Sequence, residues 1–93
     1  RLPQYKGGRE KLEIKLNKEL ISGLRKAGFN TNFLLKCSID KKGKVQDISL
    51  IPNIEAIFEN KIITYFKNFE GMQPGIIANM KVEFPLEIPF IFN

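Results

Sequence analysis

The residue types that most often carry out catalysis are scarce in this chain. It has no histidine, the usual general base near neutral pH, and its one cysteine is Cys37. Cys37 alternates with Phe33 and Leu35, which predicts a buried thiol rather than a nucleophile. No serine lies in a G-x-S-x-G context, and neither a P-loop nor a dinucleotide-binding fingerprint is present. We therefore expect a protein that is not an enzyme.

Candidate metal ligands are also few. Asp40 and Asp47 flank a predicted turn, but calcium takes about six to eight oxygen ligands, more than these two side chains supply. A lone cysteine excludes a cysteine-based zinc site and an internal disulfide. The sequence therefore predicts no metal and no cofactor.

The chain closes with MKVEFPLEIPFIFN, a segment whose chemistry lies in its backbone. Apolar residues alternate with the rest from Val82 to Phe92, which predicts a β-strand. Pro85 and Pro89 share one parity, and residues of one parity direct their backbone groups to the same side of a strand. Because proline cannot donate a hydrogen bond, we predict an edge strand whose free side lacks two donors.

Other elements must position this strand. A leucine every four residues predicts an amphipathic helix over residues 9–26, with Gly28 as its stop. A second apolar stripe predicts a helix over residues 53–69. Between them, residues 33–51 alternate as a β-hairpin with its turn at 40–43 and a bulge near residues 46–47. Residues 71–79 are expected to form a loop.

The predicted order is α-β-β-α-β in a single domain, residues 1–93. We expect an α+β fold with a three-stranded antiparallel sheet in the order 2-1-3. Both helices should cover one face, because a small sheet needs a packed face to be stable. The terminal strand then lies at an edge, as its prolines require.

Charge is uneven along the chain, whose net charge is +5. Residues 1–44 hold twelve basic and four acidic side chains, whereas residues 45–93 hold three and six. A basic half suits an anionic partner such as nucleic acid or a membrane surface, and a lysine-rich surface that serves only solubility is the simpler interpretation. The predicted aromatic face of the terminal strand is a core face and no RNP-like motif is present, so nucleic-acid binding is the weaker alternative.

Four motifs in order resemble the TonB C-terminal domain family over nearly the whole chain. Gly7 and Gly8 match the glycine pair of its Phe-Pro-Gly-Gly lead-in. The family's D-x-x-G-x-V hairpin is matched by IDKKGKV, its W-x-P-G loop by MQPG, and its Y-x-L-P-I-x-F ending by LEIPFIF. Departures are Lys6 for proline, Met72 for tryptophan, the absence of Tyr-Pro near residues 24–30, and the additional Pro85.

The resemblance implies a periplasmic domain, tethered to the inner membrane in a longer protein, that couples inner-membrane energy to outer-membrane transport. Since the chain begins with Arg1, we expect it to be a fragment. A transporter segment would add as a strand to the terminal edge, and a missing N-terminal region would bind the inner-membrane partner. The residues expected to bind the segment are Gln4, Tyr5, Lys81, Val82, Glu83, Phe84, Leu86, Glu87, Ile88 and Phe90. A cell-envelope interaction module without a transport role, or a strand-swapped homodimer, remains the main alternative.

Overall fold

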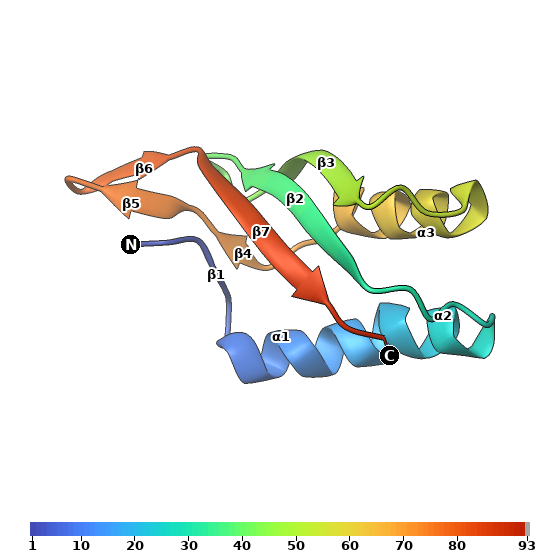
Figure 1. The fold of residues 1–93 in the computed structure, drawn as a ribbon. Helices are drawn as coiled ribbons and strands as arrows, with labels where there is room; N and C mark the ends of the chain where they lie inside the picture. Colours follow the sequence, from blue (N-terminus) through green and yellow to red (C-terminus); the bar gives the residue numbers. More distant parts are fainter. Residues whose placement is uncertain (93) are drawn as a thin grey trace.

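The computed structural model describes residues 1–92. Four helical segments and seven strands lie in this part of the chain. Figure 1 shows how they are arranged. In chain order they are β1 (Gln4–Tyr5), α1 (Arg9–Leu16), η1 (Asn17–Ile21), α2 (Ser22–Lys26), β2 (Phe33–Ile39), β3 (Val45–Ile51), α3 (Ala56–Lys67), β4 (Met72–Gln73), β5 (Gly75–Ile77), β6 (Met80–Val82) and β7 (Phe84–Phe90). None of the helices formed by residues 1–92 is long and apolar enough to cross a membrane.

The first helix is continuous, as predicted for residues 9–26. The segments α1, η1 and α2 follow one another directly with helical backbone angles at each junction, and η1 is a π-helical turn. The helix stops where Gly28 adopts a φ of 90° and the Phe29 amide donates to the Leu24 carbonyl. The second helix, α3, is shorter than the predicted 53–69: it begins at Ala56, after the N-cap residue Glu55, and ends at Lys67.

The main sheet is antiparallel, with the strand order β3-β2-β7 (Figure 1). This order confirms the predicted arrangement, with the terminal strand at one edge. The predicted bulge is also present: the β2–β3 register shifts between Lys36 and Ser38, and Asp47 adopts a φ of 54°. Ser38 donates its hydroxyl hydrogen to an Asp47 carboxylate oxygen at 3.1 Å, which fixes the bulge.

One hydrophobic core joins both helices to the same face of the sheet. Phe33, Leu35, Cys37 and Ile39 are buried, whereas the intervening residues of β2 are not. The same buried cluster contains residues of the first helix, of α3 and of the loops that flank them: Leu16, Leu20, Leu24, Phe29, Ile62, Phe66 and Phe69. The alternating pattern of β2 thus predicted the buried face correctly.

The expected loop at residues 71–79 is wrong in detail. Met72 and Gln73 form β4, which pairs with β1, and β5 pairs with β6 in a tight hairpin. Ala78 and Asn79 turn this hairpin with φ values of 51° and 64°, a two-residue turn whose twist matches its strands. The predicted terminal strand is consequently divided at Glu83: β6 pairs with β5, and β7 pairs with β2.

Candidate partner-binding edge

β7 is paired along one side only. Its partner is β2, from Phe33 opposite Phe90 to Ile39 opposite Phe84, with no shift in register. Among residues 1–92, no strand pairs with the other side of β7. The structure therefore places an open backbone edge where the sequence predicts one.

The prolines determine which backbone groups this edge presents. In an antiparallel strand, the N–H and C=O of one residue point to the same side, and successive residues point alternately toward the partner strand and away from it. Pro85 and Pro89 cannot donate, yet the ladder with β2 is unbroken opposite both. Residues 86, 88 and 90 must therefore face β2. The open edge between residues 84 and 90 presents three carbonyls, of Pro85, Glu87 and Pro89, and a single N–H, that of Glu87.

Side chains of β7 divide in the same way between core and solvent. Phe90 is buried, and Leu86 and Ile88 are half-buried against the core. Pro85, Glu87 and Pro89 are exposed. Glu87 lies opposite Lys36, with 3.8 Å between a carboxylate oxygen and Nζ, a pair exposed to solvent. The apolar side chains of β7 therefore pack against the core and stabilise the fold.

A hollow of about 210 Å³ lies between the first helix and the end of β7. The helix contributes the apolar Leu12, Leu16 and Ile21, and β7 and the residue after it contribute Ile88 to Ile91. Polar residues at four-residue spacing also line it: Arg9, Glu13 and Asn17. Arg9 Nε donates to Glu13 Oε1 at 3.3 Å, and both side chains are exposed. An extended segment on the open edge would pass beside this hollow, which can hold its side chains.

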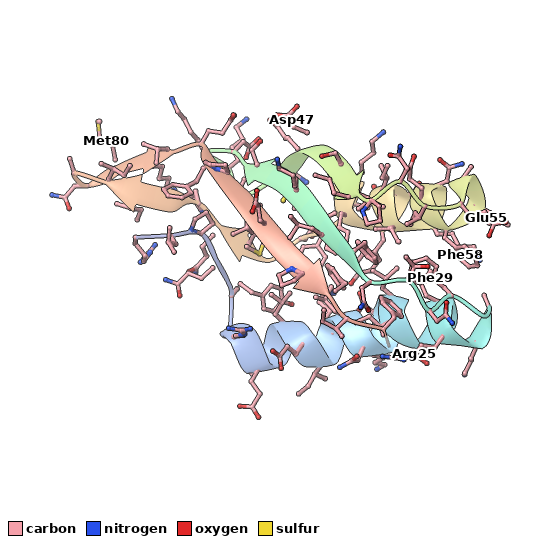
Figure 2. The ribbon with its side chains drawn as sticks, in the orientation of Figure 1. Arg25, Phe29, Asp47, Glu55, Phe58 and Met80 are labelled. Atoms are coloured by element: carbon pink, nitrogen blue, oxygen red, sulfur yellow. The ribbon has the colours of Figure 1, made fainter. Side chains whose placement is uncertain are left out.

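The segment after β7 is fastened to the domain. The Phe92 amide donates to Asn32 Oδ1 at 2.7 Å, and the Phe92 carbonyl accepts from Arg25 Nη1 at 3.0 Å. The Arg25 guanidinium also lies 5.1 Å from the centre of the buried Phe92 ring. Figure 2 shows Arg25 at the end of α2. These contacts fix the position of the edge at its C-terminal end.

The residues predicted to bind a partner do not form one continuous site. Phe84, Leu86, Glu87, Ile88 and Phe90 lie in β7, and Glu83 precedes it. Lys81 and Val82 belong to β6 and pair with Ile76 and Gly75, so β5 occupies one side of that strand.

Gln4 and Tyr5 form β1 opposite Gln73 and Met72. The Tyr5 ring lies 5.8 Å from that of Phe69, which makes it a packing residue of this small sheet. The structure therefore brings these two residues to β4 and not to the edge of β7.

The groups that the first helix contributes were not predicted from the sequence. The four-residue spacing of Arg9, Glu13 and Asn17 was visible in the sequence. What the spacing could not show was that this side of the helix lies along β7. The carbonyls of Pro85 and Pro89 were also left out of the predicted site, although their edge position was inferred correctly.

Among residues 1–92, four groups have a perturbed pKa: burial raises that of Cys37 in β2, and the other three lie between the two helices. The Tyr65 hydroxyl donates to Glu19 at 2.9 Å, and burial together with this bond raises the pKa of Tyr65. Hydrogen bonds from Lys15 and Tyr65 lower the pKa of Glu19, and the bond to Glu19 raises the pKa of Lys15. Over residues 1–92, no group of three or more His, Cys, Asp or Glu side chains could hold a metal ion.

Comparison with protein-family models, curated proteins and solved structures finds no match to this chain.

Proposed function

We propose that this chain is a non-enzymatic, TonB-like periplasmic domain that binds an extended segment of an outer-membrane transporter. The segment adds as a fourth strand beside β7 and so links the domain to the transporter. The observation that carries the proposal is the open side of β7. The backbone groups of Pro85, Glu87 and Pro89 face away from β2 there, beside the hollow between the first helix and β7. A region outside this chain tethers the domain to the inner membrane and receives the energy that is coupled to transport.

The two edges of the sheet differ in their fitness for this role. β3, at the other edge, is bulged at Asp47, and a bulge twists an edge strand away from regular pairing. β7 runs in uninterrupted register from Phe84 to Phe90 and therefore offers the straighter template. This difference favours β7 as the edge to which a partner adds.

The edge also selects how the added strand binds. With three acceptors and one donor, β7 receives N–H groups from the partner but returns only the Glu87 N–H. Two partner carbonyls per segment thus remain in contact with water, and each lost bond weakens binding by about 0.5–1.5 kcal/mol. We expect a reversible contact in which apolar side chains of the segment, held in the hollow beside Leu12 and Leu16, supply much of the affinity.

Titration of the isotope-labelled domain with a short peptide from the periplasmic end of a transporter tests the proposal. The amides of residues 81–92 and those lining the hollow should shift, whereas a peptide with alternate residues replaced by proline should have no effect. If instead only Lys11, Lys15, Lys18 and Lys41 shift, with an oligonucleotide and at low salt, the domain binds nucleic acid and the proposal is wrong.

The open edge also suits a second copy of the chain, which is the alternative partner. A homodimer joined edge to edge, or one that exchanges β7, would bury the Glu87 N–H without any transporter. Sedimentation velocity over a range of protein concentrations separates the two. A monomer that binds the peptide supports transporter binding, whereas a dimer that does not respond to the peptide supports the envelope module without a transport role.

A further inference from the structure

We propose that the β5–β6 hairpin is a membrane-contact element whose tip inserts into the headgroup region of an anionic phospholipid bilayer. We define the tip as residues 77–80. Ile77 and Met80 are opposite each other in the β5–β6 register, which places both side chains on one face. Their exposed fractions are 56% and 63%, so two large apolar side chains stand together in solvent. This pair forms a small apolar patch at the end of the hairpin.

The hairpin projects from the domain at the end opposite α2 and α3 (Figure 1). Met80 lies at this projecting end and points away from the sheet and the helices (Figure 2). The turn residues Ala78 and Asn79 are also exposed and uncharged. The tip can therefore enter a surface before any other part of the domain reaches it.

The hairpin is held in this position by the rest of the chain. The Arg1 amino group donates to the Ile76 carbonyl and the Ile76 amide donates to the Arg1 carbonyl, which ties residue 1 to β5. On one face, the Phe84 ring lies so close to Gly75 that a Cβ there would be 3.0 Å from it. A two-stranded hairpin alone is marginally stable, so these contacts keep the tip extended.

Basic side chains surround the base of the hairpin. Lys81 is exposed on β6 itself. Gly43 packs against the backbone of Met72, close to Pro74, so the turn at 40–44 lies beside the start of β5. This turn carries three exposed lysines, Lys41, Lys42 and Lys44. The nearby acids are Asp40, which accepts from the amides of residues 42 and 44, Asp47, which accepts from Ser38 opposite Pro85, and Glu83. Four lysines against three acids leave this end with an excess of positive charge.

The apolar tip and the lysines at the base of the hairpin match the two parts of an anionic membrane surface: the boundary of the acyl chains and the layer of lipid phosphates. The apolar pair would reach the boundary between headgroups and acyl chains, as the apolar face of an interfacial helix does. The lysines would lie within about 10 Å of the lipid phosphates, where screening by salt is still incomplete.

A bilayer fits this tip better than a protein does. Stable protein interfaces bury about 1,200 Å² or more, which needs a broad surface rather than two side chains on a narrow projection. A fluid lipid layer closes around a projection of any shape. The inference is independent of the edge of β7, which is a different surface of the domain.

Flotation of the chain with lipid vesicles tests the inference. The chain should bind vesicles that contain phosphatidylglycerol and should not bind vesicles of phosphatidylcholine alone. The variant I77S/M80S should lower the partition coefficient about tenfold or more, because both inserted side chains become polar. I57S, which alters an isoleucine that is 60% exposed on α3, is the matched control and should bind as the unaltered chain does.

A second pair of variants tests the charge. K41Q/K42Q should lower binding about fivefold or more, whereas K18Q/K26Q, with the same net charge but altered on the first helix, should change it less than twofold. Equal binding of I77S/M80S and the unaltered chain would overturn the inference. So would a tip variant that floats normally but no longer binds the transporter peptide, because the tip would then contact protein.

Discussion

Ser38 and Pro85 are direct partners in the β2–β7 ladder, and the register continues unshifted on both sides of them. A proline within a regular ladder must direct its missing donor away from the partner strand. This one pairing therefore shows which side of β7 is open. It also shows that the additional proline leaves the sheet intact and changes only what the open edge offers to a partner.

Restoring the missing donors should strengthen partner binding. In P85V and in P89V the edge regains one N–H, and each should lower the dissociation constant of the transporter peptide about two- to tenfold. Isothermal titration calorimetry measures the change. E87V is the matched control, since it adds the same side chain to the same edge without a new donor. Tightening by E87V as well would assign the effect to side-chain packing.

Removing an apolar side chain beside the hollow should weaken the same complex. Ile91 is 66% exposed and lines the hollow, so it is free to pack against a bound segment. I91S should raise the dissociation constant about fivefold by removing apolar area from the contact. Fluorescence anisotropy of a labelled peptide measures this, with I57S as the control. Equal affinities for I91S and the unaltered chain would place the segment away from the helix.

The bulge in β3 should tolerate glycine but not a β-branched residue. Asp47 has a φ of 54°, where a bulky side chain is strained by about 1–2 kcal/mol. D47V should lower the free energy of unfolding by at least this amount, because it also removes the bond from Ser38. Urea denaturation measures it. D47G relieves the backbone strain, and S38A removes only the hydrogen bond. Both variants should therefore lose less free energy of unfolding than D47V. A D47V variant as stable as D47G would contradict the backbone assignment.

Stability should fall in alkaline solution through Tyr65. Its pKa is raised above the ordinary value of 10.0, so the folded state keeps a proton that the unfolded chain releases. The Tyr65 hydroxyl contributes fully to the free energy of unfolding below pH 10, and this contribution is lost as the pH rises further. Y65F should therefore melt below the unaltered chain at pH 8, and the difference in Tm should narrow above pH 10. A constant difference would show that Tyr65 titrates normally.

Periodicity predicted the parts of the fold whose patterns are local. The leucines of residues 9–26 and the alternation of β2 each describe one buried face, and one face is enough to orient an element. The bulge was predicted because Val45 and Leu50 cannot share a face in a regular strand. The edge position of β7 followed from two prolines of the same parity.

The features that were missed depend on contacts between distant segments. The two-residue strands β1 and β4 are too short for any periodicity, and they pair residues that are far apart in the chain. The β5–β6 turn uses Ala78 and Asn79 at positive φ without a glycine, so the usual hairpin signal is absent. The hollow beside β7 depends on where the helix lies in space, which no spacing along the helix specifies.

The exchange of the Glu87 amide hydrogen with solvent tests the central claim most directly. Glu87 has the one N–H on the open side of β7 between residues 84 and 90, whereas residues 86 and 88 face β2. In the free domain, the Glu87 amide should exchange rapidly and its two neighbours slowly, and saturation with the transporter peptide should slow Glu87 alone. An amide at Glu87 that is already protected in the free monomer, or that still exchanges rapidly in the saturated complex, would contradict strand addition at this edge.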